Sequence, residues 1–106
     1  MPADIYRLRI MPQAAEDLDN IFAYISNNLH NPQAAGQLMA DIEAAFMTLK
    51  NIPYAYPSCS NEYLQKKNYR KLIIKNYMAF YIIQEETKST LVMRVLYSRR
   101  DYEQLL

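Results

Sequence analysis

The chain has 106 residues, of which 51% are hydrophobic and 22% are charged, and its formal net charge is +1. This length and composition predict one globular domain over residues 1–106, long enough to bury a single core. A charge this close to zero excludes a chain-wide field for nucleic acid or membrane, so a cationic site must come from local clustering of the 12 Lys and Arg residues.

The chain contains one cysteine, Cys59, and one histidine, His30. A single cysteine cannot close an intramolecular disulfide, and the sequence contains neither a signal peptide nor a long apolar span. We therefore expect a cytoplasmic protein that makes no contact with a membrane. One Cys and one His do not make a metal-ligand set, and they lie far apart in the sequence. We expect no metal, no cofactor and no catalytic Cys–His pair.

A strand is predicted at residues 5–11, where side chains alternate between two faces. Arg7 and Arg9 fall on the face expected to be exposed, with Ile5. The face expected to be buried carries the other apolar members of the alternation, Tyr6, Leu8 and Ile10. The exposed face of the first strand would therefore carry two arginines.

Two amphipathic helices are predicted next, and each has a proline, Pro12 or Pro32, at its first helical position. Asn31 is expected to cap the second helix, which continues to about Lys50. Apolar residues recur at helical spacing in both segments. They are Leu18, Ile21, Phe22, Ile25 and Leu29 in the first, and Leu38, Met39, Ile42, Ala45, Phe46 and Leu49 in the second. The two helices would form an αα-hairpin whose apolar stripes need a sheet to pack on.

The remainder of the chain predicts a long loop followed by a three-stranded meander. Residues 53–68 contain two prolines and no clean period, which indicates a surface loop with room for one helical turn around residues 62–65. Apolar runs then follow at residues 69–74, 77–84 and 91–98, separated by connections too short to join anything but antiparallel neighbours. The predicted fold is α+β in the order β-α-α-β-β-β, an antiparallel sheet with the helical hairpin on one face.

The other face of this sheet is predicted to be partly open, and it is the candidate site. Arg94 interrupts the apolar residues of the last strand, so the side of that strand that carries it is expected to be the open one. The cations that this face could hold are Arg7, Arg9, Arg94 and either Arg70 or Lys71, joined by Arg99 and Arg100. Such a patch suits phosphates or an acidic partner segment. Open faces also carry Arg and Lys merely to stay solvated and to prevent edge pairing, and the pattern names no substrate.

Four segments of the sequence match motifs of a known protein family. No single segment is diagnostic, but their order and spacing together are fairly specific. They are residues 14–24 with the spacing A-x-x-D-L-x-x-I-x-x-Y, residues 31–35 at the hairpin, residues 69–72 entering the sheet, and residues 96–101 at its end. Through these segments the chain resembles the RelE/ParE family of bacterial type II toxins over nearly its whole length. The resemblance implies the same element order, and a cognate antitoxin as partner.

The resemblance implies two possible targets. RelE-like members are ribosome-dependent endoribonucleases, in which Arg and Lys stabilise the phosphate transition state while a Tyr or His moves protons. ParE-like members share the fold and act by binding and poisoning DNA gyrase, with no catalytic set of their own. The implied target is therefore either DNA gyrase or the ribosome with its mRNA.

Two positions depart from the nuclease branch of the family. Met78 stands where that branch has the arginine of a Tyr-Arg-x-x-Tyr stretch, and a thioether cannot neutralise a phosphate. Tyr97 stands where many members have histidine, and it could shift protons only if its pKa fell far below about 10. The resemblance therefore favours a ParE-like toxin, with a RelE-like mRNA endoribonuclease and a non-toxic binding module as alternatives.

The site residues implied by these readings fall into two groups. For the nuclease, the catalytic candidates are Arg70, Arg99 and Arg100 as phosphate contacts, and Tyr97 or Tyr102 for proton transfer. For target or phosphate binding, the candidates are Arg7, Arg9, Lys71 and Arg94.

Overall fold

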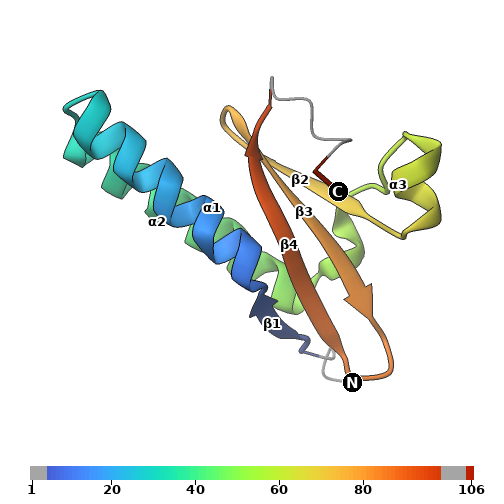
Figure 1. Cartoon of the computed structure of the whole chain (residues 1–106). Coiled ribbons are helices and arrows are strands. Elements are labelled where there is room, and N and C mark those ends of the chain that lie inside the picture. The colour runs from blue at the N-terminus through green and yellow to red at the C-terminus, as the bar shows by residue number, and fades with distance from the viewer. Residues whose placement is uncertain (1–4, 99–104) are drawn as a thin grey trace.

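A computed structural model describes residues 5–98 and 105–106 of the chain (Figure 1). Its helices and strands follow the predicted order, with one added short helix between the hairpin and the meander. In chain order they are β1 (Arg7–Ile10), α1 (Pro12–Ala23), a π-helical segment (Tyr24–Asn28), α2 (Pro32–Asn51), a 3₁₀ turn (Pro53–Ala55), α3 (Glu62–Lys66), β2 (Arg70–Ile74), β3 (Tyr77–Gln84) and β4 (Ser89–Tyr97).

The four strands form one sheet in the order β1-β4-β3-β2. The meander is antiparallel as predicted, because short turns join β2 to β3 and β3 to β4. In contrast, β1 pairs parallel to β4, with Arg7 opposite Ser89 and Ile10 opposite Val92. The α+β fold is confirmed, but the sheet is mixed rather than wholly antiparallel. No short turn joins β1 to its neighbour, so the sequence pattern did not constrain their relative direction.

The pairing of β3 with β4 contains a β-bulge that changes which residues share a face. The register shifts between Phe80 and Tyr81, which lie opposite Arg94 and Val92, so Met93 has no partner opposite it. Because of this extra residue, Val92 and Val95 both point to the hairpin side although three positions separate them. Simple alternation along β4 therefore predicts the wrong partners for each face.

The helical hairpin forms as predicted and covers one face of the sheet (Figure 1). Pro12 begins α1 and Pro32 begins α2, and the Asn31 side-chain oxygen accepts a hydrogen bond from the Ala34 N–H at 3.0 Å. The residues of α2 that pack on the sheet, Leu38, Ile42, Phe46 and Leu49, share one cluster with Leu72, Ile74, Ala79, Tyr81, Val92 and Val95. The hairpin face therefore contains the main core.

The opposite face of the sheet is here called the far face. It was predicted to be partly open, but its middle is covered. Met78, Phe80 and Leu96 point to this side and are buried in a second apolar cluster. The cluster is completed by Cys59, Leu64 of α3 and Tyr69, with Leu105 and Leu106 packed against it. Figure 1 shows α3 and the end of the chain on the side of the sheet away from the hairpin. The chain itself covers the middle of the face that was the candidate site.

The segment before β2 is more ordered than a surface loop. The predicted helical turn is α3, capped by Asn61, whose side-chain oxygen accepts a hydrogen bond from the Leu64 N–H at 3.2 Å. The Cys59 N–H donates to the Tyr69 carbonyl at 3.0 Å, and the Lys71 N–H donates to the Pro57 carbonyl at 3.3 Å. These bonds hold the segment along the outer edge of β2.

None of the helices in the described part of the chain is long and apolar enough to cross a membrane.

Candidate functional site

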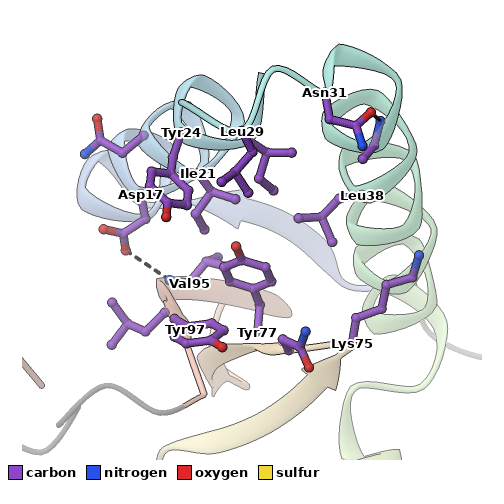
Figure 2. A pocket seen from close by; sticks show the side chains of 15 residues that line it. Asp17, Ile21, Tyr24, Leu29, Asn31, Leu38, Lys75, Tyr77, Val95 and Tyr97 are labelled. Carbon is purple, nitrogen blue, oxygen red and sulfur yellow. Dashed lines mark hydrogen bonds between the residues drawn. The ribbon is translucent and has the colours of Figure 1, made fainter. Parts of the chain in front are cut away.

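The hairpin and the end of the sheet enclose a groove of about 780 Å³. It lies where α1 and α2 extend past the start of β3 and the end of β4 (Figure 1), so apolar residues there have no strand to pack on. Its apolar wall consists of Ile21, Ile25, Leu29, Leu38 and Val95 (Figure 2). Its polar rim includes Asn20, Tyr24, Asn31, Lys75, Asn76 and Tyr97. An apolar floor inside a polar rim is suited to an amphipathic peptide segment.

Two tyrosines form the sheet side of this groove. Tyr77 and Tyr97 are cross-strand partners whose ring centroids lie 5.6 Å apart. Figure 2 shows the Tyr77 side chain pointing from the sheet toward the hairpin. Burial raises the pKa of Tyr77, and the nearby phenols of Tyr97 and Tyr24 raise it further. The Tyr77 hydroxyl therefore stays protonated at neutral pH and can donate a hydrogen bond to a groove occupant.

Asp17, which lines the groove between α1 and β4, belongs to a buried ion pair with Arg94. The Arg94 guanidinium donates from Nε to Asp17 Oδ2 at 2.7 Å and from Nη2 to Asp17 Oδ1 at 2.9 Å. The Val95 N–H also donates to Asp17 Oδ2, at 3.0 Å. Because β1 ends at Ile10, no strand lies on the β1 side of this part of β4, and the Asp17 carboxylate accepts the N–H that such a strand would have bound. The pair fixes α1 against the open edge of β4.

The prediction that Arg94 lies free on an open sheet face is wrong. Its side chain is 14% exposed, and a third donor, Nη1, binds the Leu105 carbonyl at 3.3 Å. The hydrogen bonds to Asp17 raise the pKa of Arg94 further, so its charge is permanent but already neutralised. Arg94 does lie opposite Phe80 on the far-face side of β4, but its guanidinium is bound by Asp17 and by the Leu105 carbonyl instead of being free.

The structure separates the candidate cations of the meander. Arg70 lies opposite Tyr81 and therefore points to the hairpin side, whereas Lys71 lies opposite Phe80 and points to the far face. The Arg70 Nη1 donates to the Tyr56 carbonyl at 2.6 Å, and its guanidinium lies 4.9 Å from the centre of the Tyr54 ring. Arg70 thus anchors the segment that follows α2.

The two arginines of β1 are exposed, as predicted. Leu8, between them, packs on the hairpin-side cluster, so Arg7 and Arg9 point to the far-face side of the sheet at its β1 edge. Neither side chain makes a hydrogen bond, ion pair or ring contact with the described residues. These are the cations of the predicted site that remain available to a partner on this edge.

Met78 and Tyr97, which occupy positions of the nuclease pattern, do not meet in one site. Met78 is 5% exposed within the far-face cluster, whereas Tyr97 lines the groove on the hairpin side. Arg99, Arg100 and Tyr102 lie outside the described residues. The described residues therefore do not bring the candidate phosphate contacts and proton-transfer groups together.

Sequence reasoning missed a polar cluster at the end of the sheet away from the groove. The Glu85 carboxylate accepts hydrogen bonds from the hydroxyls of Tyr6, at 3.0 Å, and Tyr54, and from the Lys88 ammonium at 2.9 Å. These bonds, with that of Tyr54 contributing most, lower the pKa of Glu85 to about 2, and the bond to Glu85 raises the pKa of Tyr54 to about 12. Tyr6 lies 79 positions from Glu85, so no local pattern could have predicted the contact.

The groove itself was also missed, although a signal for it exists. The apolar stripe of the first helix continues through Ile25 to Leu29, further than a sheet of short strands can cover.

Cys59 is buried, and burial raises the pKa of its thiol, so it is not an activated nucleophile. The described ranges contain no cluster of three His, Cys, Asp or Glu side chains that could hold a metal.

Comparisons with known proteins agree with this architecture. A family model described as the ParE toxin of the type II toxin-antitoxin system, parDE, matches residues 8–102. No curated protein sequence matches the chain. Solved structures that share its fold include three whose descriptions name toxin–antitoxin systems or complexes.

The first is a chromosomal ParDE system from P. aeruginosa, with a TM-score of 0.72 and 19% identity, covering 90% of this chain and 98% of that one. The second is the RelBE2 complex from Mycobacterium tuberculosis, with a TM-score of 0.62 and 20% identity, covering 88% and 98%. The third is an archaeal RelE–RelB complex from Pyrococcus horikoshii OT3, with a TM-score of 0.55 and 12% identity, covering 91% and 98%.

The family match extends from β1 almost to the end of the chain, and its elements are those that build the groove and both apolar clusters. The structural neighbours include ParE-type and RelE-type complexes, so the fold alone does not separate the two branches. The chain belongs to the RelE/ParE family and is a toxin of a type II toxin–antitoxin system.

Proposed function

We propose that this toxin inhibits DNA gyrase by binding it and does not cleave RNA. The observation that carries the proposal is the burial of Met78, which is 5% exposed beneath the far-face cluster. A nuclease of this family has a cation at that position to stabilise the charge that develops on the phosphate. In this chain the position holds an uncharged thioether that Leu64 and the last two residues help to cover.

The other described candidates support the same reading. Arg94 is neutralised by Asp17, and Arg70 is bound to the Tyr56 carbonyl, so neither guanidinium is free to clamp a phosphate. Tyr97 faces the groove on the opposite side of the sheet from Met78. Acid–base catalysis needs its groups within hydrogen-bonding reach of one reacting site. The described residues offer surfaces for protein contacts and no such convergent set.

We propose further that the cognate antitoxin binds in the groove between the hairpin and the sheet. Apolar residues of an amphipathic helix would pack on Ile21, Ile25 and Leu38, which the sheet leaves uncovered. The polar rim would then contact the backbone and polar face of that helix, with the Tyr77 hydroxyl as one donor. The groove lies on the hairpin side, so the antitoxin and the target need not compete for the same residues.

Two assays on the purified toxin test the proposed activity. We expect it to inhibit supercoiling by DNA gyrase and to leave mRNA on translating ribosomes intact. Cleavage of that mRNA, lost in Arg100→Ala or in Tyr97→Phe while the protein stays folded, would establish the RelE-like alternative. Normal growth of cells that express soluble toxin without antitoxin would instead indicate a non-toxic binding module.

A further inference from the structure

We propose that Arg7 and Arg9, together with Ile5, form the surface through which this toxin binds an acidic segment of its protein target. The inference rests on the proposed function, because it names the part of the molecule that a binding-type inhibitor would use. The surface lies at the β1 edge of the sheet, on its far-face side.

The proposal follows first from which cations remain available. Arg94 and Arg70 are bound within the protein, and the Lys88 ammonium is paired with Glu85 at 2.9 Å. Arg7 and Arg9 are exposed, and neither side chain forms a hydrogen bond, ion pair or ring contact with the described residues. An acidic partner can therefore bind the two guanidinium groups without breaking an interaction with that part of the chain.

The backbone holds the two arginines in a fixed arrangement. They are two positions apart on one strand, so they share a side of the sheet with a separation of about 6.6 Å. The Arg7 N–H donates to the Lys88 carbonyl at 2.7 Å, the Met11 N–H donates to the Val92 carbonyl at 2.9 Å, and Leu8 is packed on the core. Only the side chains need to be ordered on binding, which limits the entropic cost of association.

The neighbouring side chains favour a protein partner over nucleic acid. Ile5 is 68% exposed and follows the same alternation as the two arginines, so it adds aliphatic surface on their side of the sheet. Arginine beside exposed aliphatic surface is typical of protein interfaces. A protein held by the DNA backbone usually makes about 6–10 phosphate contacts, whereas this edge offers two arginines on a chain of net charge +1.

The spacing also defines the ligand. Each guanidinium can bind a carboxylate through two parallel hydrogen bonds, which lysine cannot do. Carboxylates at alternate positions of an extended segment lie about 6.6 Å apart, and those three or four positions apart on a helix have Cβ atoms about 5–6 Å apart. The partner is therefore a segment of the target with two such acidic residues and an apolar side chain that packs on Ile5.

Single charge reversals with a matched control test the inference. Arg7→Glu and Arg9→Glu each change the charge by the same amount as Lys66→Glu, which alters an exposed lysine of α3. We expect each arginine variant to lose growth inhibition at equal expression and to need about tenfold more protein to inhibit gyrase. Lys66→Glu should match the wild type in both assays. Antitoxin affinity should be unchanged in all three, because the groove lies elsewhere.

The conservative variants separate this role from a folding defect. Arg7→Gln and Arg9→Gln remove the charge from an exposed strand position and should lose activity in the same direction, with unchanged thermal unfolding. Full toxicity of the double variant R7E/R9E would overturn the proposal. Binding of the toxin to duplex DNA alone that is weakened by Arg9→Glu would also overturn it, since the contact would then be with phosphate.

Failure of the proposed function gives a different result. If the wild type arrests growth but leaves gyrase active, the gyrase target is wrong, and the growth assay still decides whether the two arginines bind the target. If the wild type does not arrest growth at all, both proposals are wrong.

Discussion

At the scale of single residues, Asp17 is a buried carboxylate whose charge must be compensated within the protein. Its carboxylate is 7% exposed and is balanced by one guanidinium and one backbone N–H. Removing one member of a buried pair leaves the other charged and unpaired, which is more destabilising than the pair is stabilising. Asp17 thus joins the helical hairpin to the edge of β4.

We expect Asp17→Asn to lower the free energy of unfolding by about 3 kcal/mol, because the Arg94 guanidinium would remain buried without a counter-charge. Urea denaturation followed by circular dichroism measures the loss. The matched control is Asp41→Asn, which removes the surface ion pair with Lys75 and should have a much smaller effect. Equal losses in the two variants would contradict the role given to Asp17.

Glu85 makes stability depend on pH in the acid range. Its pKa is lowered from 4.5 to about 2, first by the hydrogen bond from Tyr54 and then by that from Lys88. A folded-state pKa below the unfolded value stabilises the protein above about pH 4.5, and this contribution is lost as the pH falls toward 2. Unfolding midpoints between pH 6 and pH 2 should therefore fall less steeply in Glu85→Gln than in the wild type. Glu86→Gln, in the same turn, should follow the wild type.

At the scale of elements, the sequence predicted each helix and strand but not how all of them meet. Periodicity located the hairpin, its Asn31 cap and the meander because these depend on neighbours in the chain. It did not predict the parallel pairing of β1, the bulge opposite Phe80, or the cover over the far face. These features depend on contacts between distant segments, and a bulge changes the face of every residue beyond it.

The difference between local contacts and contacts of distant segments also explains which parts of the candidate site could be predicted from the sequence. Exposure of Arg7 and Arg9 followed from a regular strand, and the structure confirms it. Arg94 lies on the predicted face, opposite Phe80, but its burial and neutralisation were missed because its partner, Asp17, lies 77 positions away. The groove is formed by a hairpin longer than its sheet, which no single segment reveals.

The short helix α3 is expected to protect the far face. Leu64 is fully buried within the cluster that also contains Cys59, which is 4% exposed. Leu64→Ala should lower the free energy of unfolding by about 3 kcal/mol and speed the reaction of Cys59 with a thiol reagent. Ile73→Ala, at a side chain that is 63% exposed, is the control and should change neither quantity much. Unchanged reactivity of Cys59 in Leu64→Ala would mean that α3 does not cover it.

At the scale of the whole molecule, the sheet separates the two surfaces that we propose for the antitoxin and the target. The groove opens on the hairpin side at one end of β4, whereas the two exposed arginines lie on the far-face side at the β1 edge. Under our proposals, an antitoxin bound in the groove inhibits the toxin through its own bulk or through a further segment that reaches the β1 edge. Within the described residues, the middle of the far face is buried by the chain itself.

A groove variant should lose antitoxin while keeping toxicity. Leu29, which lines the groove and is 55% exposed, can be replaced by Asp with little effect on folding. Because Leu29→Asp removes an apolar side chain that the antitoxin would bury, its affinity for the antitoxin should fall at least about tenfold, as measured by calorimetry. Met47→Asp changes an α2 side chain that is 50% exposed and does not line the groove, so its affinity should equal that of the wild type. Equal weakening in both variants would place the antitoxin elsewhere.

The central claim is our proposal that this toxin acts by binding gyrase, and a supercoiling assay tests it most directly. Purified toxin is titrated into DNA gyrase with relaxed plasmid, alone and after mixing with its antitoxin. We predict dose-dependent loss of supercoiled product with the toxin alone and full supercoiling when the antitoxin is present. Undiminished supercoiling in excess toxin, from a preparation that stops growth when expressed in cells, would contradict the account.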